Sequence, residues 1–199
     1  MGVPVATDSG LRDHVLSMLK KLLHRRTPRR TLAEADEAAA DKLRARGVKV
    51  GKGCRIYSRE FSTEPYLVEL ADGVAISQGA KFLTHDGAAR LLRHRRPAVQ
   101  HFGRIVVGTD TFIGENAIIL PGTRIGARCV IGAGAVVRGV IPDNSLVVGN
   151  PATVIGRAST YLERLNTSPR TLDTFDMEET ARREFILAHL AGEEKDAGT

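Results

Sequence analysis

The sequence of 199 residues predicts a mainly β fold in which the chain coils into a three-sided prism, with α-helices at both ends. The first observation is an aliphatic repeat with a period of six, which matches neither the period of a helix nor that of a strand. Its members follow one another at this interval: Val107, Ile113, Ile119, Ile125, Ile131 and Val137. A period of six fits a coil with three sides, each of which sends one large aliphatic side chain inward.

Two further positions of each hexad agree with this interpretation. Glycine follows the aliphatic residue at positions 108, 114, 126 and 132, with Leu120 as the exception. The residue four places after the aliphatic one is small, which suits a tight corner with little room inside: Thr111, Ala117, Thr123, Cys129 and Ala135. The same spacing occurs earlier in the chain in two separate runs: Val50 and Ile56, and then Leu70, Ile76 and Phe82.

Breaks in the period predict where the chain leaves the coil. The interval from Phe82 to Val107 is one hexad plus 19 residues, so we expect residues 87–105 to form an inserted loop. Residues 57–69 form a second, weaker break. The coiled region is therefore expected over residues 48–157, where each coil buries its interior by stacking on the next.

Helical patterns flank the coiled region. In the N-terminal segment, residues 1–47, Asp8 or Ser9 is expected to begin a helix whose apolar residues extend from Leu11 to Leu23. Thr31 and Glu34 form a capping box for a second helix, from Leu32 to Arg46, and Gly47 ends it. In the C-terminal segment, residues 158–199, we expect helices over 158–165 and 176–190. These helices would cover the open edges of the coil.

Composition narrows the class of protein. No run of 18 apolar residues is present, and Met1 to Ser9 lack the pattern of a secretory signal, so we expect a cytoplasmic protein. Cys54 and Cys129 occupy small corner positions, which predicts buried packing, and two cysteines do not make a zinc site.

The net charge is +6, and two basic runs dominate it, Lys20 to Arg30 and Arg90 to Arg96. Nucleic-acid binding is not expected, because no aromatic interleaving or nucleic-acid motif accompanies the charge. The second run lies in the inserted loop, where it could attract phosphates or an acidic saccharide. Contact of the N-terminal basic helix with a membrane surface is left open.

The period, the glycine position and the small position together resemble the hexapeptide-repeat, left-handed parallel β-helix family over about residues 48–157. The segment 82–87, Phe-Leu-Thr-His-Asp-Gly, resembles the catalytic segment of the hexapeptide acyltransferases. That group includes the galactoside, maltose and streptogramin O-acetyltransferases. The resemblance implies that His85 is the general base. Asp86 and Arg90, at the start of the loop beside it, are the candidate substrate residues.

Two more motifs resemble the segments of this family that bind acetyl-CoA. They are residues 108–122, and residues 131–142 followed by Gly-Asn-Pro-Ala at 149–152. Phe112 stands where the family usually has Trp, which lines the acyl pocket, and Ala133 lets the pantetheine arm lie against the backbone. The candidate residues for acetyl-CoA are Phe112, Glu115, Ala133, Arg138 and Thr153, which align with family positions, and Arg157, a possible phosphate ligand just after the coil.

Histidine suits acyl transfer on chemical grounds. Its ordinary pKa of about 6.5 allows it to remove the proton of an attacking hydroxyl at neutral pH. A backbone N–H could stabilise the oxyanion that develops on the thioester, and neither a covalent intermediate nor a metal is required. A three-histidine zinc site, as in γ-class carbonic anhydrases, is not expected, because His94 and His101 lie in the loop and have no coil register.

The sequence thus predicts an acetyl-CoA-dependent O-acetyltransferase whose acceptor is a saccharide or another small alcohol. The resemblance implies a homotrimer with active sites between subunits. Two alternatives stay open: an N-acyltransferase acting on an amino sugar, and a non-catalytic trimeric scaffold. The identity of the acceptor and the acyl chain length do not follow from the sequence.

Overall fold

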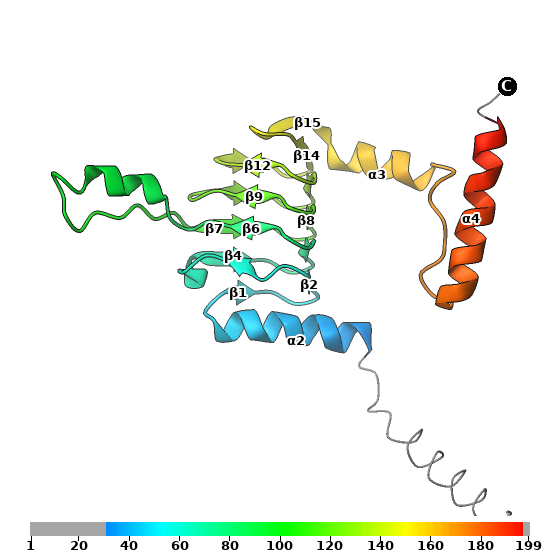
Figure 1. Cartoon of the computed structure of the whole chain (residues 1–199), viewed down its shortest axis with the longest axis horizontal. Helices are drawn as coiled ribbons and strands as arrows, with labels where there is room; N and C mark the ends of the chain where they lie inside the picture. The colour runs from blue at the N-terminus through cyan, green and yellow to red at the C-terminus, as the bar shows by residue number, and fades with distance from the viewer. Residues whose placement is uncertain (1–30, 197–199) are drawn as a thin grey trace, which may run out of the picture. The chain divides into compact units, whose positions relative to one another are not determined.

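The computed structural model describes residues 31–196, so the predicted helix from Leu11 to Leu23 lies outside the described residues. Three β-sheets form the body of the chain (Figure 1). The first contains, in spatial order, β1 (Lys49–Val50), β4 (Val68–Leu70), β7 (Ile105–Val107), β10 (Arg124–Ile125) and β13 (Val140–Ile141). The second contains β15 (Thr153–Arg157), β14 (Ser145–Val148), β11 (Val130–Ile131), β8 (Phe112–Ile113), β5 (Ala75–Ile76) and β2 (Arg55–Ile56). The third contains β12 (Val136–Val137), β9 (Ile118–Ile119), β6 (Lys81–Phe82) and β3 (Glu60–Phe61).

Successive strands from β1 to β14 enter the first, second and third sheets in turn, so each set of three strands makes one coil. All neighbouring strands are parallel except β14 and β15. The predicted mainly β fold with flanking helices is therefore confirmed, and its strands are parallel.

The strand register follows the hexads. Phe112 pairs with Val130 and Ile118 with Val136, so one coil takes 18 residues, or three hexads, in this region. Lys81 pairs with Ile118, a step of 37 residues that exceeds one coil by 19. The insertion ends at residue 104 rather than 105, because Ile105 is fully buried and already pairs with Val68 in the first sheet.

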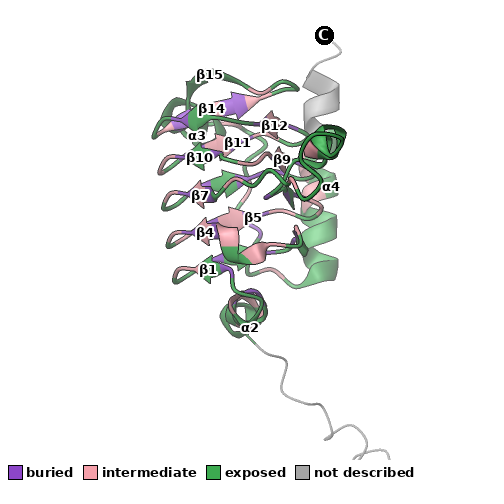
Figure 2. Cartoon of the chain, turned by 90° about the vertical axis from the view of Figure 1, so that its left-hand side faces the viewer, coloured by how far each residue is buried: buried purple, intermediate pink, exposed green. Residues whose placement is uncertain are grey.

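The interior of the coils holds one cluster of buried apolar residues. Figure 2 marks buried positions on the stacked strands. The six repeating aliphatic residues are at most 3% exposed, and the five small corner residues at most 1%. The rings of Phe61 and Phe82 stack with centroids 4.6 Å apart, one coil above the other. Glycine after the aliphatic residue has a steric cause: a Cβ on Gly114 would lie 2.6 Å from the backbone nitrogen of Ala133 in the next coil.

Helix α2 (Leu32–Ala45) begins with the predicted capping box, in which the Glu34 N–H donates to Thr31 Oγ1 at 3.3 Å and the Thr31 N–H to Glu34 Oε2 at 2.8 Å. Ala40 and Leu43 are buried. The guanidinium of Arg44 donates to the carbonyl oxygens of Val50 and Gly51, which satisfies backbone acceptors at the edge of the first coil.

Two helices follow the last coil: α3 (Ala158–Asn166) and α4 (Glu179–Asp196). The prediction that this last helix begins at residue 176 was wrong, because Asp176 and Met177 lie in the turn and bend that precede α4. The Glu178 carboxylate accepts a hydrogen bond from the Thr180 N–H at 2.9 Å, so the helix begins there. Among residues 31–196, none of the helices combines the length and the apolar character that crossing a membrane requires.

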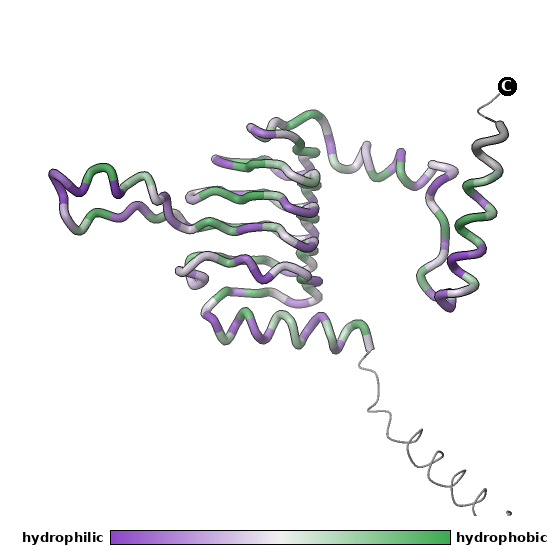
Figure 3. Tube along the Cα trace, viewed as in Figure 1, coloured by the Kyte–Doolittle hydropathy of each residue, from purple (hydrophilic) through white to green (hydrophobic). Residues whose placement is uncertain are grey.

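Two short 3₁₀ helices interrupt the coils: η1 (Pro65–Leu67) in the weaker break, and η2 (Gly87–Leu92) in the inserted loop. The loop, residues 86–104, projects sideways from the third strand of the second coil (Figure 1). Hydrophilic residues occupy its outer end (Figure 3). This projection determines the place of the candidate site.

Candidate active site

His85 lies at the base of the inserted loop, three residues after strand β6 ends. Both arms of the loop are hydrogen-bonded there. The Gly103 N–H donates to the Thr84 carbonyl at 2.8 Å, and the Asp86 N–H donates to the His101 carbonyl at 2.9 Å. His85 therefore stands where the regular coil and the loop meet, with its backbone held on both sides.

The imidazole of His85 is oriented by the preceding coil. Its Nδ1 lies 2.9 Å from Oε2 of Glu64 and 3.2 Å from Oγ of Ser62. The register explains this contact, because Phe61 pairs with Phe82, so a residue of the 62–64 segment lies beside the residue 21 positions later. The side chain of His85 is 41% exposed, whereas that of Glu64 is 15% exposed, so the carboxylate is largely covered and the ring is accessible.

Hydrogen bonds hold Glu64 in its charged form. The Thr63 hydroxyl donates to Oε1 at 2.6 Å, and the Thr84 hydroxyl donates to Oε2 at 2.8 Å. The Thr63 hydrogen bond, with those from His85 and Thr84, lowers the pKa of Glu64 from 4.5 to about 2, although burial of the carboxylate opposes the shift.

This arrangement fixes the tautomer of the neutral imidazole. An ionised carboxylate can only accept hydrogen bonds, so Nδ1 of His85 carries the hydrogen that is shared with Glu64. The other nitrogen, Nε2, then has a free lone pair and can act as a base. The geometry therefore prepares His85 to take a proton at Nε2.

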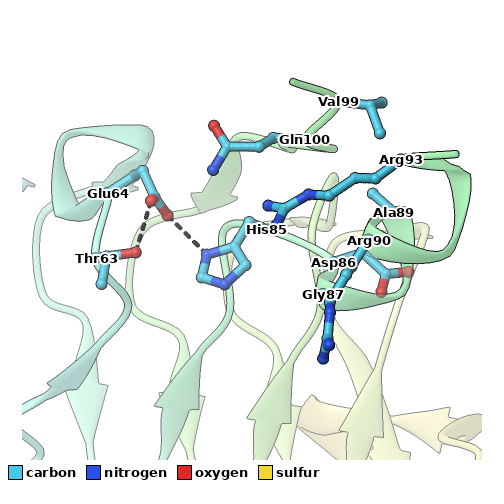
Figure 4. Close-up of a pocket in the computed structure, with 10 residues that line it drawn as sticks. All are labelled: Thr63, Glu64, His85, Asp86, Gly87, Ala89, Arg90, Arg93, Val99 and Gln100. Atoms are coloured by element: carbon cyan, nitrogen blue, oxygen red, sulfur yellow. Dashed lines mark hydrogen bonds and ion pairs between the residues drawn. The ribbon is translucent and has the colours of Figure 1, made fainter. Parts of the chain in front are cut away.

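A cavity of about 350 Å³ opens beside His85 and extends under the loop (Figure 4). Its lining comes from the 63–64 segment and from both arms of the loop: Thr63, Glu64, His85, Asp86, Gly87, Ala89, Arg90, Arg93, Val99 and Gln100. The predicted substrate residues Asp86 and Arg90 thus lie in the same cavity as His85. Asp86 also has a structural part, because its carboxylate accepts a hydrogen bond from the Ala88 N–H at 2.8 Å and caps η2.

The six residues expected to bind acetyl-CoA lie elsewhere on the chain, and none of them lines the His85 cavity. Glu115 and Ala133 occupy the same corner of adjacent coils, where the Gly134 N–H donates to the Glu115 carbonyl at 2.8 Å. Phe112 lines a second cavity, of about 390 Å³, together with Cys129 and Leu162. Arg138, Thr153 and Arg157 are exposed, the last two on β15.

Arg138 shares a corner with the segment that leads to His85. It follows Val137, which aligns with Phe82 through Ile119 in the third sheet. Arg138 therefore lies at the corner of Leu83, two coils further along. Of the six residues, Arg138 is the only one that comes directly after a strand of the third sheet, the sheet from which the inserted loop departs.

Glu64 and Ser62 contact His85 but were not predicted from the sequence, and Thr84, within the quoted segment 82–87, was given no role. The only signal for Glu64 and Ser62 is the register of 21 residues between β3 and β6, which the weaker break at residues 57–69 conceals. Neither cysteine belongs to this site: Cys54 and Cys129 are free and buried, and burial raises the pKa of each thiol. Within residues 31–196, no group of three or more His, Cys, Asp or Glu side chains is placed to hold a metal ion.

Comparison with known proteins gives three findings. Residues 104–139 match the family model described as bacterial transferase hexapeptide (six repeats). The chain is 42% identical to protein CapG of Staphylococcus aureus over 124 residues, which are 61% of this chain and 72% of CapG. It is 49% identical over 51 residues to WbbJ of Escherichia coli strain K12, whose name proposes O-acetyl transfer in lipopolysaccharide biosynthesis, but this match covers only 26% of either chain.

Solved structures are also similar. The maltose O-acetyltransferase of Clostridium difficile 630 superposes with a TM-score of 0.49 and 26% sequence identity, over 72% of this chain and 84% of that one.

Proposed function

The chain belongs to the bacterial hexapeptide-repeat transferases, and on this premise we propose that it is an acetyl-CoA-dependent O-acetyltransferase acting on a saccharide or another small alcohol. Its class as an acyltransferase, which the sequence predicts, is confirmed by the family and by relatives that are named acetyltransferases. The observation that carries the proposal is the His85–Glu64 pair, which leaves Nε2 of an accessible imidazole free at the edge of a cavity.

In the proposed reaction, Nε2 of His85 removes the proton of the acceptor hydroxyl as its oxygen attacks the thioester carbonyl. The C–O bond forms, the C–S bond breaks, and the imidazolium returns its proton to the departing thiolate of CoA. Glu64 stabilises the transient positive charge on the ring through Nδ1. No enzyme-bound acyl group is needed.

The small residues at the corner of Glu115 and Ala133 support a place for the pantetheine arm of acetyl-CoA. Gly132 and Gly134 flank Ala133, and Ala133 and Gly134 are exposed, so an extended chain could approach the backbone closely. Arg138 and Arg157 are exposed guanidinium groups that suit the phosphates of CoA. We assign Phe112, Glu115 and Thr153 to the same donor site, as the family resemblance implies.

Because these donor residues do not line the His85 cavity within one chain, we propose a homotrimer in which His85 of one subunit meets the acetyl-CoA site of the next. We also propose that the coil is left-handed, as in the family that the repeats resemble. A measured molar mass of three chains in solution would support this assembly, and a monomer that retains full turnover would contradict it.

The acceptor class is tested by incubating the full chain with acetyl-CoA and a panel of saccharides, amino sugars and small alcohols while free CoA is measured. Release that depends on a hydroxyl acceptor supports the proposal. Release only with amino sugars, with the product acetylated at nitrogen, would replace it by N-acyl transfer. The absence of both release and acetyl-CoA binding would favour a scaffold.

A further inference from the structure

The inserted loop carries a concentration of positive charge that the fold does not use. Residues 86–104 contain five arginines and a single carboxylate, that of Asp86, which leaves a net charge of +4. Among the described residues, Asp86 forms no ion pair with these arginines, and its carboxylate accepts the Ala88 N–H as the cap of η2. The five are Arg90, Arg93, Arg95, Arg96 and Arg104.

Within the part of the chain that the structure describes, none of these arginines forms an ion pair. Two arginines near the first coil do form ion pairs: Arg44 with Glu37 and Asp41, and Arg55 with Asp36. The loop arginines are exposed, so their charges lie on the surface, and no described carboxylate forms an ion pair with them.

Two of the five line the cavity of His85. Arg90 and Arg93 belong to it, whereas Arg95 and Arg96 do not. In Figure 4, the guanidinium of Arg93 extends toward His85, and that of Arg90 extends past Gly87. The two carboxylates of the cavity make their hydrogen bonds to other groups than the arginines: Glu64 contacts His85 and two threonine hydroxyls, and Asp86 accepts the Ala88 N–H. The cavity therefore places two arginines that have no ion-pair partner among the described residues beside the proposed base.

We infer that this cavity binds an acceptor that carries a phosphate group, with Arg93 and Arg90 as its ligands and the reacting hydroxyl directed at His85. The inference rests on the proposed function. A phosphate ester carries a charge of about −1.5 to −2 at neutral pH and three strong acceptor oxygens. Arginine binds such groups with two parallel hydrogen bonds. The volume of about 350 Å³ lies in the lower range of small-molecule sites, which suits a phosphorylated monosaccharide.

The first test measures binding of glucose 1-phosphate, glucose and inorganic pyrophosphate to the full-length chain by calorimetry, so it does not depend on turnover. The proposal predicts that glucose 1-phosphate and pyrophosphate bind and that glucose binds at least tenfold more weakly. Removal of both cavity cations in Arg90→Gln/Arg93→Gln should weaken phosphate binding by about tenfold or more. The matched variant Arg95→Gln/Arg96→Gln loses the same charge from the same loop and should change binding less than about threefold, a screened long-range effect.

Acetyl-CoA also carries phosphates, so its affinity is measured in the same variants. The proposal predicts an unchanged affinity for acetyl-CoA in Arg90→Gln/Arg93→Gln. An equal loss for acetyl-CoA would assign these arginines to the donor and overturn the proposal. An equal loss in the two double variants would reduce the effect to general electrostatics and overturn it as well.

A second arm separates a soluble sugar phosphate from a lipid headgroup. Vesicles of phosphatidylglycerol and of phosphatidylcholine are compared for binding. Binding to the anionic vesicles that is lost in Arg90→Gln/Arg93→Gln but kept in Arg95→Gln/Arg96→Gln would support the site with phosphate presented by a lipid. If malonate, a dicarboxylate, binds as tightly as pyrophosphate, or if no phosphate probe binds, the inference fails even where CoA release shows that the transferase is active.

Discussion

Replacement of Glu64 by glutamine tests the arrangement that the site depends on. In Glu64→Gln, the amide keeps the volume of the side chain and an oxygen that can accept the hydrogen of His85 Nδ1, but the negative charge is lost. The ground-state orientation of the neutral imidazole should therefore survive. What the variant loses is the stabilisation of the imidazolium that forms when Nε2 takes a proton.

The magnitude follows from the charge separation and the exposure. Two unit charges about 4 Å apart interact by about 1 kcal/mol in water and by about 4 kcal/mol at an effective dielectric constant of about 20. His85 is 41% exposed and Glu64 is 15% exposed, so the pair lies between these limits, and we take about 2 kcal/mol. This corresponds to a decrease in kcat of about 30-fold, since about 1.4 kcal/mol is a factor of ten.

The assay is acceptor-dependent release of CoA, with kcat and KM determined separately for the donor and the acceptor. We expect kcat to fall while the KM for acetyl-CoA stays constant. Glu60→Gln is the matched control, because it removes the same charge from strand β3, where Glu60 is exposed. If Glu64→Gln turns over as fast as the wild type, Glu64 does not stabilise the imidazolium, and the reasoning is refuted.

Three further predictions concern stability and reactivity. The fold lowers the pKa of Glu64 from 4.5 to about 2, so the stabilising contribution of its charge is present above about pH 4.5 and is lost as the pH falls toward 2. The difference in unfolding free energy between wild type and Glu64→Gln should therefore shrink over that range. A constant difference would contradict this prediction. Because burial raises the pKa of Cys54 and Cys129, neither thiol should react with a thiol reagent at pH 8 before the protein unfolds; prompt labelling of the folded chain would show that they are accessible. Gly103→Ala should destabilise the protein by about 1–3 kcal/mol and lower activity, because the added Cβ would collide with the backbone of Gly122 at the base of the loop. In the same denaturation experiment, Gly156→Ala should be nearly neutral, because its Cβ has open space.

The hexads could be predicted because their spacing is a direct consequence of the coil. Each side of the coil requires one inward aliphatic residue, so such residues recur every six positions along the chain. This spacing predicts that Ile119 and Ile131 belong to the core, and the longer interval across residues 87–105 predicts the loop. His85 could be located for the same reason, since it stands where the period stops.

Glu64 could not be predicted, because it lies in the break at residues 57–69, where the hexad period no longer gives its distance from a corner. Contact with His85 arises from a register of 21 residues that appears only once the strands are paired. The residues expected to bind acetyl-CoA differ from Glu64, because their positions could be predicted but their arrangement around the site could not. Motifs located Phe112, Ala133 and Arg138 along the chain, but a single sequence carries no pattern that tells which subunit completes which site.

The most direct test of the account compares wild type, His85→Ala and His94→Ala for acceptor-dependent CoA release, with acetyl-CoA binding measured by calorimetry in each. His94 lies in the same loop but does not line the cavity, so it controls for disturbance of the loop. The account predicts that His85→Ala loses on the order of 10²–10⁴-fold in kcat while binding acetyl-CoA as the wild type does, and that His94→Ala stays near wild type. Turnover by His85→Ala at the wild-type rate would contradict it.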